Sequence, residues 1–146
     1  MLFKNNLIKI ELSIIIMEKT PSQKWNEQIA QHRKKCQMIL ESSKSIRYVG
    51  LINEYGMTLT GILKPGLKTL LSRESARSEF FLVSTLLIMR NRVSTPLGKM
   101  SHVIFQHDKV TVIAFQRKEG IYYISINQNT KPDVINKIIL KIRKII

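Results

Sequence analysis

Cysteine and long apolar runs are scarce in this sequence, and each shortage excludes a class of protein. The 146 residues contain a single cysteine, Cys36, which rules out a disulfide framework within the chain and predicts a reducing, cytoplasmic setting. The longest uncharged apolar run, residues 80–89, has ten residues. A transmembrane helix needs about 20, so we do not expect a membrane-spanning protein.

Acidic residues are also scarce, with 10 Asp and Glu against 24 Lys and Arg, for a net charge of +14. No two carboxylates fall at a spacing that suggests an acid/base pair, and we therefore expect no enzyme. A field of this sign attracts nucleic acid, anionic lipid or an acidic protein, and the same charge also serves solubility alone. Composition does not choose among these alternatives.

Histidine and cysteine do not form a convincing metal or nucleophile site. His32 and Cys36 have the spacing of four that can present two ligands on one side of a helix, but two ligands do not close a zinc site. Cys36 also falls on an apolar stripe, which argues against a reactive thiolate. His102 and His107 would point to opposite faces of one strand. We expect neither a bound metal nor a cofactor.

The N-terminal segment is set apart from the fold. Isoleucine and leucine alternate with polar residues over 8–16, the period of a half-buried strand. Residues 17–146 begin like an ordinary globular chain and contain no repeat, low-complexity tract or long linker. We predict that residues 1–16 are an extension outside the native fold, and that residues 17–146 form a single domain.

In the first half, proline and glycine mark where the expected elements change. Thr20-Pro21 is typical of a capped helix start, and apolar residues then recur at helical spacing from Trp25 to Leu40. Residues 46–53 and 57–64 are expected to form strands. The turn between them contains Gly56, which is free to adopt a positive φ.

In the second half, a central helix is expected from about Ser72 until the chain approaches Pro96. Strands follow at 100–107, 110–117 and 121–127, and their short turns imply an antiparallel meander. A last helix is expected with Asp133 as its cap. The order α-β-β-α-β-β-β-α predicts one α+β domain, with a five-stranded antiparallel sheet and helices on its faces.

A central helix between a hairpin and a three-stranded meander resembles the roadblock/LC7 fold, a relative of profilin-like domains. The stretch "LINEYG", with Glu54 and Gly56, is similar to the family's hairpin turn. Residues 45–71, "SIRYVGLINEYGMTLTGILKPGLKTLL", also resemble an uncharacterised domain family of ammonia-oxidising archaea, which implies no function.

The central helix has more apolar surface than a sheet can cover. One stripe, with Phe80 and Leu87, would cover the sheet. A second stripe consists of Leu82, Leu86 and Met89, and burying three such side chains contributes roughly 5 kcal/mol. The resemblance implies that this helix packs on its own copy while third strands pair, so we expect a homodimer. In the alternative, the chain's own terminal helices cover this stripe.

Two kinds of partner are expected. In the first hypothesis the dimer is a non-enzymatic scaffold for a protein partner, which the resemblance implies is a small GTPase or its regulator. The candidate partner face comprises Arg47, Asn53, Thr58 and Thr60.

The alternative hypothesis is nucleic-acid binding through salt-sensitive, sequence-independent phosphate contacts. Its basic patch would form where the first and last helices lie side by side, and comprises Arg33, Lys34, Lys35, Lys137, Lys141, Arg143 and Lys144. The same patch could rest on an anionic membrane surface. The sequence shows no base-reading element, and a small ligand also stays open.

Overall fold

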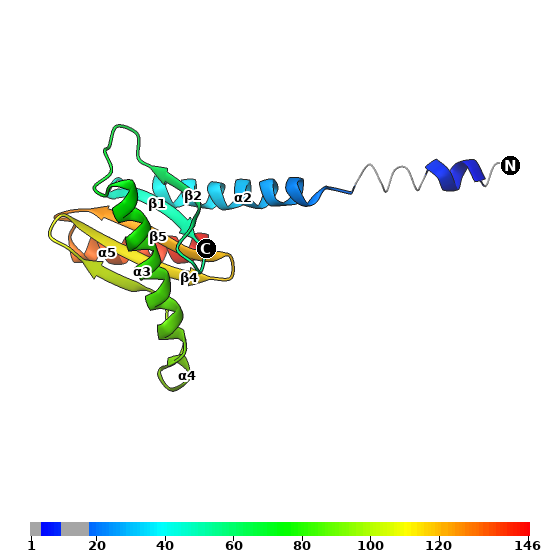
Figure 1. Cartoon of the computed structure of the whole chain (residues 1–146). Helices are drawn as coiled ribbons and strands as arrows, with labels where there is room; N and C mark the ends of the chain where they lie inside the picture. Colours follow the sequence, from blue (N-terminus) through cyan, green and yellow to red (C-terminus); the bar gives the residue numbers. More distant parts are fainter. Residues whose placement is uncertain (1–3, 10–17) are drawn as a thin grey trace. The chain divides into compact units, whose positions relative to one another are not determined.

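The computed structural model describes residues 4–9 and 18–146 (Figure 1). The chain divides into two compact units, residues 1–31 and residues 32–146. Within the described residues, every helix falls short of the length and apolar character needed to cross a bilayer. Of the predicted strand at 8–16, residues 8 and 9 belong instead to a helical segment at 4–9. The rest of that strand, like most of the predicted extension at 1–16, lies outside the described residues.

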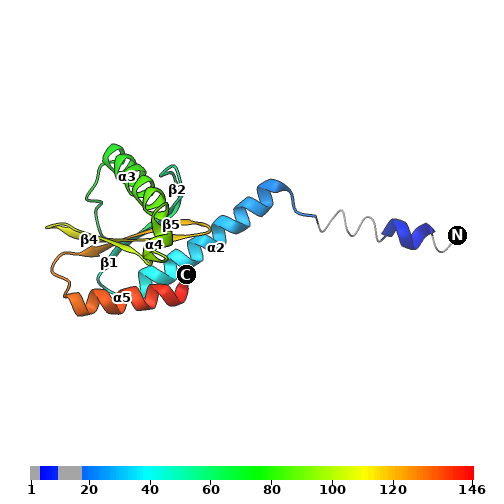
Figure 2. The ribbon, with the colours of Figure 1, turned by 90° about the horizontal axis from the view of Figure 1, so that it is seen from below.

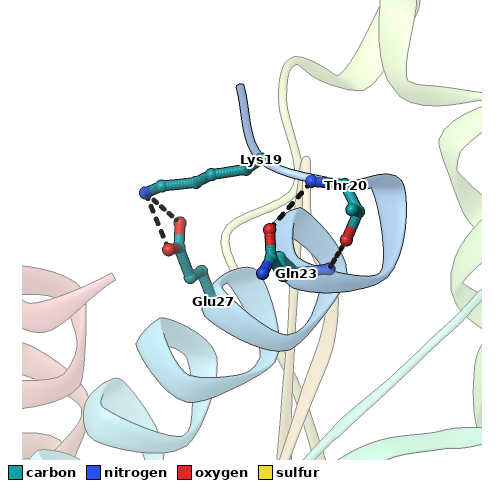
Figure 3. A network of polar contacts seen from close by, with 4 residues as sticks. All are labelled: Lys19, Thr20, Gln23 and Glu27. Carbon is teal, nitrogen blue, oxygen red and sulfur yellow. Dashed lines mark hydrogen bonds and ion pairs between the residues drawn. The ribbon is translucent and has the colours of Figure 1, made fainter. Parts of the chain in front are cut away.

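Helix α2 (Pro21–Glu41) has Thr20 as its cap and Pro21 as its first residue, as predicted. The Thr20 hydroxyl accepts a hydrogen bond from the Gln23 amide at 3.2 Å, and the Gln23 side chain accepts one from the Thr20 amide at 2.9 Å (Figure 3). This reciprocal pair is a capping box. Lys19 adds a 2.7 Å ion pair to Glu27. Trp25 is 54% exposed, so the predicted apolar stripe of this helix is buried only near its C-terminal end.

The second unit is built on one antiparallel sheet in the order β2-β1-β5-β4-β3. Its elements are β1 (Ile46–Ile52), β2 (Thr58–Leu63), α3 (Arg73–Asn91), α4 (Ser94–Leu97), β3 (Val103–Gln106), β4 (Val110–Arg117), β5 (Gly120–Asn127) and α5 (Pro132–Ile145). The predicted α+β class, five antiparallel strands and element order are confirmed. Two differences are the extra helix α4 and a β3 shorter than the predicted 100–107.

Both faces of the sheet are covered (Figure 2). Helix α3 packs on one face, where Phe80 and Leu87 meet Ala114 of β4. The end of α2 and the whole of α5 pack on the other face, where Ile139 shares a core with Phe115. Neighbouring residues of a strand point to opposite faces, so β4 and β5 are buried on both sides.

Tyr48 shapes the α3 face of the β1–β2 hairpin. Gly50 and Gly61 face each other across the two strands, and a Cβ on either would collide with the Tyr48 ring. The ring therefore lies flat over two residues that lack side chains and stacks on Phe80, with ring centroids 6.3 Å apart. The two glycines are required here for close approach rather than for turn geometry.

The hairpin turn forms as predicted, with Gly56 at φ 79°. The Asn53 side-chain oxygen accepts hydrogen bonds from the amides of Tyr55 and Met57, both at 2.9 Å. Asn53, which the sequence analysis placed on the candidate partner face, therefore holds the hairpin turn in place.

The prediction that Thr60 belongs with Thr58 to an accessible partner face is wrong, because Thr60 is only 7% exposed. Thr58 pairs with Ile52 and Thr60 with Leu51, with a register shift between these two pairs. A β-bulge of this kind inserts one extra residue and reverses the alternation beyond it. Thr60 consequently lies on the same sheet face as the buried Leu51.

The predicted cap of the last helix is also wrong. The N-cap of α5 is Lys131, which makes no side-chain capping bond, and Pro132 follows it. Asp133 lies inside the first turn, where a negative charge is favourable to the helix dipole.

Candidate interaction surfaces

The second stripe of α3 is uncovered in the single chain. Leu82, Leu86 and Met89 are 64%, 39% and 57% exposed. The alternative in which the chain's own terminal helices cover this stripe is wrong, because α5 and the end of α2 pack on the opposite face of the sheet (Figure 2). Isolated exposed apolar residues are common, whereas these three lie on one helix face and form an exposed apolar patch.

An open strand edge accompanies this stripe. Among the strands that the structure describes, β3 lies at the end of the sheet and pairs with β4 alone. Its outer edge therefore presents unpaired backbone groups, which are a template for another strand. Ile104 of β3 is 42% exposed, so this edge is apolar as well as open.

The four predicted partner-face residues do not form one surface. Thr58 is exposed and Thr60 is buried. Arg47 is held within the chain, since it donates to the Asn127 side-chain oxygen and the Lys68 carbonyl, both at 3.2 Å. Asn53 is occupied by the hairpin turn. Only Thr58 stays free for a partner, beside the exposed side chains of Tyr55 and Met57.

Three of the seven predicted basic-patch residues are engaged by the protein. Arg33 donates to the Gly61 carbonyl at 3.4 Å, Lys35 lies 3.5 Å from the Glu119 carboxylate, and Lys141 donates to the Ser42 carbonyl at 3.1 Å. The other four are exposed side chains: Lys34, Lys137, Arg143 and Lys144. Because α5 and the end of α2 lie on the same sheet face, the structure does gather these charges on one side.

Sequence reasoning missed a cleft of about 780 Å³ at the start of α3. Its floor is aromatic: Phe80 meets the edge of Tyr123 at 4.9 Å between ring centroids, beside Tyr48. One wall carries Leu70 and Leu71 from the loop before α3, and the opposite wall is the β3–β4 turn at residues 107–109. These segments are far apart in sequence, and no local pattern links them. The volume lies in the range of ligand or side-chain sites.

The phenols of this cleft are held in their neutral form. Burial raises the pKa of Tyr48 to about 12. Burial also raises the pKa of Tyr123, and the neighbouring Glu79 carboxylate adds to that effect. Neither phenol can act as a base near neutral pH, so the aromatic floor of the cleft offers shape and apolar surface rather than proton chemistry.

Cys36 is a structural thiol rather than a nucleophile. It is fully buried in the core beneath α2, and burial raises its pKa to about 11, with the Arg33 charge only partly opposing this. Among the described residues, no three of His, Cys, Asp and Glu lie close enough to hold a metal ion.

Glu119 links the β4–β5 turn to α2, and its ionisation makes the stability of the fold depend on pH. It accepts a 2.7 Å hydrogen bond from the buried Tyr122 hydroxyl and lies beside Lys35. Burial alone would raise its pKa, but the Tyr122 hydrogen bond and the Lys35 charge together lower it below 4.5. Its carboxylate therefore stabilises the fold above pH 4.5, and this contribution is lost as the pH falls through the lowered pKa.

We expect Glu119→Gln to reduce the free energy of unfolding by about 1 kcal/mol at neutral pH. Urea titrations at several pH values measure this difference. The two proteins should converge in acid, where wild-type Glu119 is protonated. A difference that stays constant from neutral pH to acid would contradict the assignment.

No protein-family model and no curated protein matches the sequence. Solved structures do resemble it. The gliding protein MglB of Thermus thermophilus has a TM-score of 0.63 at 14% identity, over 80% of this chain and 84% of that one. An MglB with a tetrameric arrangement has a TM-score of 0.61 at 15% identity, over 82% of each chain. A roadblock/LC7 domain from Streptomyces avermitilis has a TM-score of 0.55 at 10% identity, over 77% of this chain and 92% of that one. This chain has a roadblock/LC7-like fold.

Proposed function

We propose that this chain is a non-enzymatic, homodimeric scaffold or regulatory module that binds a protein partner. The observation that carries the proposal is the uncovered stripe of Leu82, Leu86 and Met89 on α3. Because these side chains are about half exposed in one chain, a second copy could recover roughly 3 kcal/mol of apolar burial per copy. An MglB of similar fold has a tetrameric arrangement, which supports self-association by this architecture.

The stripe and the open edge fit one two-fold arrangement. In a homodimer with a two-fold axis the same patch is used by both copies. Packing α3 against its copy would bury the stripe, and pairing β3 with its copy would satisfy the open edge and extend the sheet. Val103 and Phe105 of β3 pack on the same core as α3, so we propose that a single axis serves both contacts.

The partner that the fold resemblance favours is a small GTPase or a regulator of one. On this chain the surface that supports such binding is the tip of the β1–β2 hairpin. Thr58 is exposed there, directly after Met57 and three residues after Tyr55, whose side chains are 65% and 68% exposed. An exposed aromatic residue beside a methionine is common in protein interfaces. Asn53 and Arg47 would then support the hairpin rather than contact the partner.

A pull-down from native extract tests the partner. The baits are the wild type, Thr58→Arg at the hairpin tip, and Asn136→Arg as a matched control at an exposed position of α5. We expect a protein that binds GTP, or that regulates such a protein, to be retained at high salt. Thr58→Arg should lose it and Asn136→Arg should keep it. Retention by all three baits, or by none, would contradict the proposal.

Nucleic-acid binding is the second candidate, favoured by the gathering of basic side chains on one face of the sheet. Lys34, Lys137 and Lys144 make no hydrogen bond or ion pair to any described residue. Such charges give salt-sensitive, sequence-independent contacts. In the pull-down this candidate predicts material that is released by nuclease or by high salt. A complex that survives both treatments would exclude it as the main function.

A further inference from the structure

The uncovered face of α3 runs without a break from the cleft to the end of the helix. Residues seven apart lie on the same side of a helix after two turns. Glu79, which lines the cleft, precedes Leu86 by seven residues; α3 then ends at Asn91, and Val93 follows in the turn that leads into α4. The stripe therefore begins at the cleft and ends at the segment 93–97, which includes α4.

Both ends of this face carry apolar side chains that one chain leaves exposed. At the cleft, Leu70 and Leu71 are 54% and 38% exposed, and at the far end Val93 and Leu97 are 46% and 72% exposed. The 19 residues of α3 separate the two ends, a distance of about 28 Å. Within one copy the two ends cannot meet.

A second copy brings the two ends together. If the stripes pack antiparallel with Leu86 at the centre, Glu79 lies about 10 Å from it on one side and the end of α3 at Asn91 about 8 Å from it on the other. The turn at the partner copy's Val93 then comes next to Glu79, and its Leu97 extends toward the cleft. Charge favours this direction, because Glu79 stands near one end of the stripe and Arg90 near the other. A parallel arrangement would set like charges against each other.

We propose that in the homodimer each copy closes the cleft of the other with its segment 93–97. Leu97 enters between Leu70 and the aromatic floor formed by Phe80 and Tyr123, and Arg90 pairs with Glu79 of the other copy. This inference rests on the proposed homodimer and adds to it a defined occupant for the cleft, which is incomplete in the single chain.

Thiol cross-linking between two different variants tests the contact. Cys36→Ala removes the native thiol, and Leu70→Cys and Leu97→Cys are then prepared as separate full-length proteins. When they are mixed and treated with a short thiol-specific cross-linker, we expect a covalent dimer. Each protein alone should give little, because identical positions lie at opposite ends of an antiparallel pair. Thr58→Cys mixed with Leu97→Cys is the matched control and should stay uncrosslinked.

Charge reversal gives a second readout that does not depend on the cross-linker. Glu79→Arg and Arg90→Glu should each raise the dimer dissociation constant about tenfold, and the double variant should recover most of the loss.

A chain that sediments as a dimer without forming the cross-link between positions 70 and 97 would overturn the inference and leave the dimer proposal intact. A monomeric wild type would overturn the homodimer itself. A small molecule retained in the cleft of the intact dimer in native mass spectrometry would also overturn the inference.

Discussion

Leu86→Glu is expected to split the homodimer into monomers or to make the chain insoluble. Leu86 lies at the centre of the exposed α3 stripe and is 39% exposed in the single chain. By symmetry the substitution puts two carboxylates close together in one apolar interface, while Arg90, one turn along α3, is already paired with Glu79 of the other copy in the proposed dimer. Leaving a buried charge unpaired costs several kcal/mol, enough to move a micromolar dimer to monomers. Sedimentation velocity or light scattering measures the result.

The matched control for Leu86→Glu is Thr58→Glu, which adds the same charge at an exposed position of β2. It should leave the sedimentation of the dimer unchanged. Thr60, the other threonine of the predicted partner face, is unsuitable as a control because it is buried beside Leu51. A wild-type protein that sediments as a monomer at micromolar concentration would end the dimer proposal.

Gly56→Ala is expected to destabilise the fold by about 2–4 kcal/mol through the combination of backbone strain and collision. Gly56 has φ 79°, a region that residues with a Cβ rarely adopt. An added Cβ would also lie 2.6 Å from the Phe81 backbone nitrogen and Cα. Because backbone atoms of a helix cannot move aside like a flexible side chain, the hairpin must shift away from α3. Urea titration measures the loss.

Gly66→Ala is the matched control for the hairpin prediction. Gly66 has φ 84°, similar to that of Gly56, but a Cβ there would meet nothing within 4 Å. It should cost only the strain of about 1 kcal/mol. The difference between the two variants isolates the contact of the hairpin with α3. Equal losses would show that this contact contributes nothing.

Local patterns in the sequence were sufficient for the elements and their order. Gly56 predicts its own turn because only glycine adopts that φ readily. Strands β4 and β5 are rich in β-branched and aromatic residues, and short turns force them to pair antiparallel. The exposed stripe of Leu82, Leu86 and Met89 also follows from helical spacing, because the sheet can cover only one side of α3.

Tertiary structure alone decided which side chains are available to a partner. The bulge that buries Thr60 arises from the register between β1 and β2, and register depends on a pairing that no single strand encodes. Two lysines of the predicted basic patch are engaged within the chain, because folding places Glu119 beside Lys35 and the Ser42 carbonyl beside Lys141. The cleft exists because the loop before α3 and the β3–β4 turn meet over Tyr123. Such contacts join residues far apart in the chain, whereas periodicity reports only on neighbours.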